Sequence, residues 1–365
     1  MKYDTLIRQA LIIDGSNTPG YVADVGLRDG RIETIGDLSA AMGEHEIDAS
    51  GRVLAPGFID VHTHDDTVVI RQPQMLPKLS QGVTTVIVGN CGISASPVTL
   101  RSDPPDPMNL LGSASAFVYP RFSDYRAAVE EAHPAVNVAA LIGHTALRSN
   151  HMDDLHRTAS VDEIAAMRVQ LQESLEAGAL GLSTGLAYAS AFNAETDEVL
   201  QLSEELTAFG AVYTTHLRSE FEPVLEAMDE AFLIGRHAKA PVIISHLKCA
   251  GAGNWGRSPQ LLASLELAAK THPVGCDCYP YAASSSTLDL KQVTDAFRIT
   301  ITWSTPHPEV GGRDLQDIAA EWDVALIDAA RRLQPAGAVY YGMDEEDVRR
   351  ILAHPLSMVG SDGLP

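Results

Sequence analysis

Short runs of alternating apolar and polar residues fill the first part of the chain. Alternation with a period of two is typical of strands that bury one face, and Gly, Asp and Asn residues separate the runs. The four runs are LIRQALIID, ADVGLRDG, RIETIGD and EIDASGRVLA. We therefore predict a small β-module over residues 1–54, in which these strands build a β-sandwich.

The pattern changes after Pro56, where apolar runs alternate with amphipathic segments. Apolar residues at three- and four-residue spacing predict helices over residues 162–177, 197–209 and 222–238. Eight apolar runs predict strands: VLAPGFI, GVTTVIVGN, VNVAALIGH, GALGLSTG, GAVYTTH, APVIISH, HPVGCDCYP and LSMVGSD. Because strands that alternate with helices favour a parallel sheet, and eight is the number in a TIM barrel, we predict an α/β fold with a (β/α)8 TIM-like barrel.

The barrel is predicted over residues 55–365. The spacer from about 280 to 355 is much longer than the others. Long excursions in a compact fold are commonly lids or binding loops. We therefore expect an insertion over the barrel mouth in this interval.

Composition narrows the classes of partner. The chain has 365 residues, of which 45% are hydrophobic, and a formal net charge of -22. Such a chain supports a full core, and its charge argues against nucleic acid or an anionic membrane surface as a partner. If the ligand is an anion, the site must therefore supply its own cations.

Targeting and thiol signals are weak. No stretch reaches about 20 uninterrupted apolar residues, which predicts a soluble, cytoplasmic protein without a membrane partner. The cysteines are too few and too irregular for a disulfide framework in a chain of this size. We expect reduced thiols, one of them a metal ligand, among Cys91, Cys249, Cys276 and Cys278.

The segment FIDVHTHDD, Phe58 to Asp66, carries two histidines at strand spacing. Because side chains two residues apart on a strand share a face, His62 and His64 point the same way. Imidazole nitrogen, thiolate and carboxylate are the ligands of zinc. The alternative is that both histidines are ordinary polar residues at a strand end.

Four other predicted strands also end on residues that can bind a metal. Active sites of β/α barrels collect at the carboxyl ends of the strands, so these residues converge although they are far apart in the sequence. Together with the two histidines they make six candidate ligands, the others being Cys91, His216, His246 and Asp362.

Two cations follow the histidines of later strands. Arg218 and Lys248 each come two residues after a candidate ligand, so they share its face if the strand geometry persists. They are the groups that an anionic ligand requires. The alternative for Arg218 is a surface pair with Glu220 or Glu222. The segment GHTALR, residues 144–148 with the preceding glycine, also follows a strand and supplies a polar group to the mouth or is structural.

These residues together resemble the amidohydrolase superfamily. A narrower set of motifs is similar to the N-acyl-D-amino-acid deacylases, also called D-aminoacylases, including the N-acyl-D-glutamate deacylase branch. The motifs are VGNCGIS, GHTALR, GLSTGLAY, THLRSE, SHLK followed by NWGRS, YPYAASSS and GSDG. The likeness is specific, because dihydropyrimidinases and dihydroorotases commonly place a carboxylated lysine where this family uses the cysteine.

The resemblance implies a role for each matching residue. Cys91, His216 and His246 would hold one tightly bound Zn²⁺, and His62 and His64 would help to form a second, weaker position. Asp362 would be the general base. The implied activity is zinc-dependent hydrolysis of the amide bond of a small-molecule N-acyl-D-amino acid to a carboxylate and a free D-amino acid.

The implied substrate-binding residues lie after other strands. Lys248, Tyr279 and a hydroxyl of the serine run 284–286, taken as Ser285, are associated in the family with the substrate carboxylate. Tyr188, the last residue of GLSTGLAY, and Arg218, expected from its strand spacing after His216, complete the set.

The chain departs from the family pattern in three places. ASAFNAE follows GLAY where many relatives have proline and glycine, and Leu247 stands where a second histidine is frequent. The chain stops at Pro365, so the family's C-terminal segment is expected to be absent. Two rival functions stay open: a dihydropyrimidinase-like hydrolase of cyclic amides, and a metal-binding barrel without catalysis.

Overall fold

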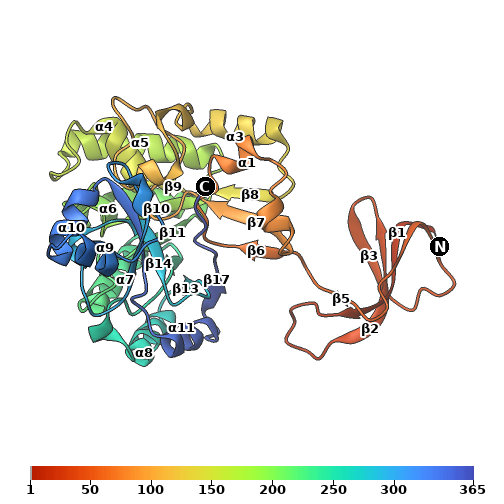
Figure 1. Cartoon of the computed structure of the whole chain (residues 1–365). Coiled ribbons are helices and arrows are strands. Elements are labelled where there is room, and N and C mark those ends of the chain that lie inside the picture. Colours follow the sequence, from red (N-terminus) through yellow and green to blue (C-terminus); the bar gives the residue numbers. More distant parts are fainter. Residues whose placement is uncertain (1) are drawn as a thin grey trace. The chain divides into compact units, whose positions relative to one another are not determined.

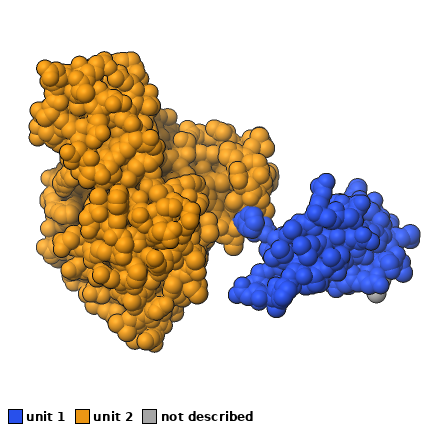
Figure 2. All heavy atoms as spheres, turned by 60° about the horizontal axis from the view of Figure 1, so that its bottom comes forward, with its two compact units in different colours: residues 1–58 blue, residues 59–365 orange. Residues whose placement is uncertain are grey.

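The computed structural model describes residues 2–365, which divide into two compact units, residues 2–58 and 59–365 (Figure 2). The first unit contains a five-stranded sheet in the order β3-β2-β1-β4, with β5 paired to β1. β1 pairs antiparallel with β2 and parallel with β4. Its strands are β1 (Lys2–Ile12), β2 (Tyr21–Arg28), β3 (Arg31–Gly36), β4 (Met42–Asp48) and β5 (Val53–Leu54).

Eight parallel strand positions form a barrel in the second unit (Figure 1), and each position is called a stave. Each of the eight predicted apolar runs overlaps one stave, and the third stave is divided into β8 and β9. The predicted (β/α)8 barrel is therefore confirmed. The strands are β6 (Phe58–Asp60), β7 (Val83–Val88), β8 (Asn137–Ala140), β9 (Ile142–Gly143), β10 (Gly181–Gly185), β11 (Val212–His216), β12 (Val242–Ile244), β13 (Val274–Cys278) and β17 (Ser357–Val359).

Backbone hydrogen bonds close the ring where the ladders are interrupted. Leu141 N donates to Val88 O at 2.9 Å, which joins β7 to the third stave. Val61 N donates to Val359 O at 3.4 Å, and an isolated parallel bridge pairs Thr63 with Gly363. The last stave thus meets the first one, and the segments that follow both strands lie side by side.

Helices surround the staves and bury their apolar faces in one large cluster (Figure 1). The three predicted helices are confirmed as α5, α6 with a following 3-10 turn (Glu204–Phe209), and α7. Ser160 and Glu163 form a capping box at the start of α5. The helices are α1 (Val68–Arg71), α2 (Leu76–Leu79), α3 (Phe122–Ala132), α4 (His144–His151), α5 (Val161–Glu176), α6 (Thr196–Ser203), α7 (Val224–Ala238), α8 (Ser258–Ala269) and α11 (Glu345–Leu352).

The long spacer between β13 and β17 has a core of its own. Its strands form a three-stranded antiparallel sheet in the order β14-β16-β15, and a separate apolar cluster packs two helices against it. The insertion expected in this interval is thus a small folded layer. Its elements are β14 (Ser284–Thr287), β15 (Ile299–Ser304), β16 (Ala336–Tyr340), α9 (Leu315–Glu321) and α10 (Leu326–Leu333).

Two further expectations concern the limits of the units and the membrane. The units divide after Phe58, four residues beyond the predicted end of the β-module. Within residues 2–365, the helices are too short or too polar to cross a bilayer.

Candidate metal centre and active site

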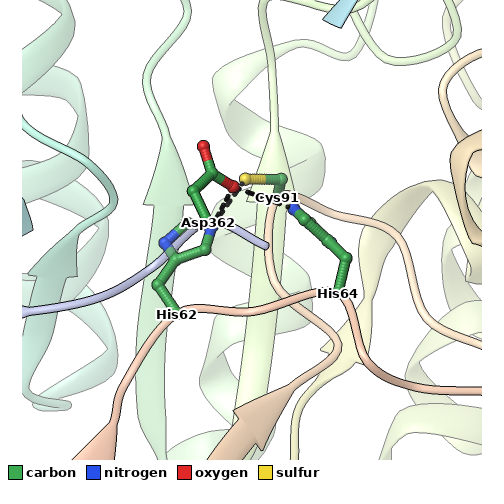
Figure 3. Close-up of side chains that lie close together, drawn as sticks. All are labelled: His62, His64, Cys91 and Asp362. Carbon is green, nitrogen blue, oxygen red and sulfur yellow. Dashed lines mark hydrogen bonds and ion pairs between the residues drawn. The ribbon is translucent and has the colours of Figure 1, made fainter. Parts of the chain in front are cut away.

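Two groups of metal-binding side chains meet at the carboxyl end of the barrel. His62, His64, Cys91 and Asp362 form one group, and their side chains point toward one another (Figure 3). Cys91, His216 and His246 form the other. Within each group the ligand atoms all lie within 4.8 Å of one another, and Cys91 belongs to both. The six predicted ligands therefore converge.

Short distances tie the groups together through the cysteine. Cys91 Sγ lies 3.2 Å from His62 Nε2 and 3.3 Å from His246 Nε2. His216 Nδ1 lies 2.9 Å from His246 Nε2. Asp362 Oδ1 lies 3.3 Å from Nε2 of both His62 and His64.

Unusual backbone conformations present three of these side chains. Cys91, His246 and Asp362 have positive φ values of 54°, 36° and 51°. Such conformations cost energy in residues other than glycine and cluster at functional sites. Gly89 lies two residues before Cys91. A side chain there would clash, because its Cβ would lie 2.2 Å from the backbone oxygen of Leu141. The chain thus turns sharply after each strand and aims the side chain back into the barrel mouth.

The electrostatics of the cluster favour anionic sulfur and oxygen. Burial acts to raise the pKa of the Cys91 thiol, but His62 and His246 outweigh it and hold that pKa well below its usual range. Burial likewise acts to raise the pKa of Asp362, but the neighbouring histidines, chiefly His62, hold that pKa well below its usual range. A buried site with anionic donors requires positive charge close by.

The same anionic neighbours favour the protonated form of two histidines. Burial acts to lower the pKa of His64, yet its hydrogen bond to Asp362 raises that pKa to about 10. Burial and Lys248 act to lower the pKa of His246, while Cys91 raises it to about 9. A divalent cation would replace these protons, because metal binding deprotonates its ligands. The nitrogen, sulfur and oxygen donors fit zinc.

A second layer of carboxylates orients the histidines. Asp277 Oδ1 lies 3.1 Å from His62 Nδ1 and accepts a 2.8 Å hydrogen bond from His246 N. Glu220 Oε1 lies 2.9 Å from His246 Nδ1. A carboxylate on the outer nitrogen fixes the tautomer and turns the other nitrogen toward the metal. Both histidines therefore direct Nε2 to Cys91.

Comparison with known proteins agrees with this donor set. A family model described as "Amidohydrolase family" matches residues 45–365. The chain belongs to the amidohydrolase family. The D-aminoacylase of Alcaligenes xylosoxydans xylosoxydans is 48% identical over 363 residues, which are 100% of this chain and 75% of that protein. The N-acyl-D-glutamate deacylase of the same organism is 46% identical over 368 residues, 100% of this chain and 74% of that one.

A solved structure shares the fold of this amidohydrolase. It is the N-acyl-D-glutamate deacylase of Bordetella bronchiseptica, complexed with zinc and a phosphonate inhibitor that mimics the tetrahedral intermediate of the reaction. The TM-score is 0.94 at 44% identity, over 99% of this chain and 76% of that chain.

Three predicted substrate-binding residues lie beside the metal centre of the amidohydrolase. Lys248 is buried, with Nζ 2.8 Å from His246 Nδ1 and 2.5 Å from Glu220 Oε1. Its Nζ lies 5.4 Å from the ring centroid of Tyr279. Tyr188 Oη lies 3.3 Å from His216 Nδ1.

Arg218 does not join this group. Its guanidinium binds Glu230, with Nε 2.9 Å from Oε2 and Nη2 2.8 Å from Oε1, and donates to the carbonyls of Phe192 and Ala194. The alternative pair with Glu220 or Glu222 is also wrong. Strand parity failed because β11 ends at His216, so Arg218 lies in the loop that follows it. Arg218 therefore holds that loop through Glu230 and two carbonyls, and its role in substrate binding stays a prediction.

Ser285 lies in β14 and differs from its neighbours in exposure. Ser284 and Ser286 are half-buried, whereas Ser285 is exposed. Since side chains alternate along a strand, Ser285 points to the opposite face from the other two. The structure does not bring Ser285 into contact with the donor cluster, and its role remains a prediction.

The GHTALR segment forms the start of α4 and is buried. His144 Nε2 and Arg148 Nη1 lie 2.8 Å and 2.6 Å from Glu198 Oε1. All three side chains are at most 1% exposed. Of the two readings left open for this segment, the contacts favour the structural one.

Asp277 is a site residue that the sequence reasoning missed. The sequence carried a signal, because Asp277 is a charged residue within the strand run VGCDC. In the structure its side chain is 2% exposed. Charged groups are almost never fully buried unless they are paired. A carboxylate inside a buried strand therefore indicates a partner, although the sequence does not say which one.

Proposed function

We propose that this chain is a zinc-dependent N-acyl-D-amino-acid deacylase, which hydrolyses a linear amide to a carboxylate and a free D-amino acid. The observation that carries the proposal is the position of Cys91, shared by both ligand groups at the barrel mouth. The chain is 46–48% identical over its whole length to a D-aminoacylase and an N-acyl-D-glutamate deacylase, which supports the reaction class.

Two zinc positions follow from the two ligand groups. We assign the tight position to Cys91, His216 and His246, and the weaker one to His62, His64 and the shared cysteine. Zinc held here would lower the pKa of water toward about 7 and polarise an acyl carbonyl.

Asp362 is the proposed general base. Its lowered pKa keeps it a carboxylate, which can accept a proton from the attacking water. The protonated Asp362 then donates that proton to the leaving amine as the C–N bond breaks. Its Oδ1 lies 3.3 Å from Nε2 of both His62 and His64, so the carboxylate borders the weaker zinc position.

Lys248 and Tyr279 are the proposed anchors for the carboxylate of the amino acid. Tyr279 Oη is buried and has no hydrogen-bond partner within residues 2–365. Buried hydroxyl groups normally make a hydrogen bond, so the Tyr279 hydroxyl can donate one to a bound acceptor. The Lys248 ammonium lies 5.4 Å from the ring centroid of Tyr279 and places a positive charge beside that residue.

The setting of the reaction is inferred from the thiols. All four cysteines are free, as expected for a chain in a reducing compartment. We infer that the enzyme acts in the cytoplasm on a small molecule. The preferred side chain needs an assay, since a relative named D-aminoacylase and one named N-acyl-D-glutamate deacylase are almost equally similar to this chain.

Release of free amine from matched D and L panels of N-acetyl amino acids tests the proposal, with zinc counted on the same sample. We expect release from D substrates with about one zinc per chain, the tight position being filled first. Hydrolysis of dihydropyrimidines or hydantoins instead would favour the cyclic-amide alternative. Bound zinc without hydrolysis of any panel member would favour the non-catalytic barrel.

A further inference from the structure

A partly buried lysine, Lys78, lies beside the loop that carries the proposed base. Lys78, on the short helix α2, places Nζ 2.6 Å from Asp60 Oδ2 and 3.1 Å from Asp65 Oδ2. The same ammonium lies 3.0 Å from Thr63 Oγ1 and 2.9 Å from Ser361 Oγ. Its side chain is 12% exposed, so these contacts are its main surroundings.

These contacts reach both segments that bring the base to the site. Asp60, Thr63 and Asp65 belong to the first stave and the histidine segment after it. Ser361 directly precedes Asp362 on the other side of the barrel closure. Lys78 is thus a point at which the two segments share one partner, although they are about 300 residues apart in the sequence.

The loop around Asp362 is held by a chain of hydrogen bonds that ends on this lysine. Ser361 N donates to Asp60 Oδ1 at 2.8 Å, and Gly363 N donates to Ser361 Oγ at 3.0 Å. Asp362 N donates to His62 O at 2.8 Å. Because φ of Asp362 is 51°, this conformation needs such support to persist.

The charge of the lysine balances the cluster. Burial acts to lower the pKa of Lys78, but Asp60 and Asp65 raise it above its usual value, so the side chain is a cation. Without it, two carboxylates would face each other in a mostly buried site, and like charges at such separations repel. Their separation would shift Asp60, and with it the backbone of Ser361.

We propose that Lys78 is a positioning residue for the deacylase reaction: with Asp60 and Ser361 it fixes the loop that aims Asp362 at the scissile amide. This inference rests on the proposed function. The residue touches neither the six candidate ligands nor the proposed carboxylate anchors, so its effect is on turnover. A misplacement of about 1 Å can reduce a rate by about 10²-fold.

The test compares Lys78→Met with Lys78→Arg, Ser361→Ala and the double variant Lys78→Met/Ser361→Ala, with Lys270→Met as the matched control. Lys270 is exposed at the carboxyl end of α8. For each variant, kcat, KM, zinc per chain and the unfolding midpoint are measured on the N-acetyl-D-amino acid that the wild type hydrolyses best.

We expect Lys78→Met to lower kcat about 10- to 100-fold, with KM within about twofold and zinc retained. Lys78→Arg should recover part of kcat, because it restores the charge. The double variant should lose no more than about twofold beyond Lys78→Met, since both substitutions act through one loop.

Three results would overturn the inference. They are unchanged kcat in Lys78→Met, a rise in KM alone, or loss of zinc in proportion to activity. If Lys78→Met does not fold, a Ser361→Ala variant with unchanged kcat overturns the inference as well. An inactive wild type would refute the proposed function itself, which is a separate outcome.

Discussion

The buried ion pair between Arg148 and Glu198 provides a test of what stabilises the barrel. Arg148 Nη1 lies 2.6 Å from both carboxylate oxygens of Glu198, and His144 Nε2 lies 2.8 Å from one of them. Arg148 also donates to the carbonyl of Ser190 at 3.2 Å. Replacement by glutamine, Glu198→Gln, keeps the shape and removes the charge, so the guanidinium stays buried without a counter-ion.

Two routes to the magnitude agree. Breaking a buried pair by removing one partner costs about 3–5 kcal/mol. Separately, burial acts to raise the pKa of Glu198, but His144 and Arg148 lower it from 4.5 to about 2. At 1.36 kcal/mol for each pKa unit, that shift corresponds to about 3 kcal/mol at neutral pH. We expect Glu198→Gln to lower the free energy of unfolding by about 3–5 kcal/mol.

The pH dependence has a definite sign. A pKa lowered by folding contributes stability above the unfolded value of 4.5, and this contribution is lost as pH falls toward about 2. The difference between wild type and Glu198→Gln should therefore shrink over that range. It should be constant between pH 6 and pH 8, where Glu198 is charged in both states.

Urea unfolding followed by tryptophan fluorescence is a suitable assay. Trp255, Trp303 and Trp322 all lie in the barrel unit, so the signal reports on that unit. A matched control is Glu173→Gln at an exposed position of α5, expected to change stability by less than about 0.5 kcal/mol. The reasoning is refuted if Glu198→Gln costs less than about 1 kcal/mol. It is also refuted if Arg148→Met and Glu198→Gln are additive, because contacting residues couple.

Three further predictions concern the metal centre. Cys91→Ala should lose zinc and activity together, because both ligand groups contain that thiolate; full zinc content by elemental analysis would contradict its role. Asp362→Asn should keep zinc and reduce kcat by about 10²- to 10⁴-fold, the contribution of acid–base assistance, and near-normal turnover would exclude it as the base. Asp277→Asn should weaken zinc binding about 10- to 100-fold in a chelator titration, since it orients His62 and His246; unchanged affinity would show that these histidines are held by other contacts.

Much of the barrel was readable from local pattern. Apolar periodicity depends on residues a few positions apart, so it located all eight staves and the three helices that were predicted. The meeting of the donors also followed, because carboxyl ends of parallel strands share one rim. The sequence by itself thus determined the architecture and brought His62, Cys91 and Asp362 to one place.

Partner choice was decided by the tertiary structure. Arg218 binds Glu230, and Lys78 joins Asp60 to Ser361, because the folded chain places the donor and acceptor atoms of these side chains within 3 Å of each other. No periodicity encodes such distances, since a hydrogen bond depends on a few tenths of an ångström between residues remote in sequence. The pattern therefore determined which side chains reach the rim. Packing of the whole barrel decided which of them face the metal centre and which hold it in place.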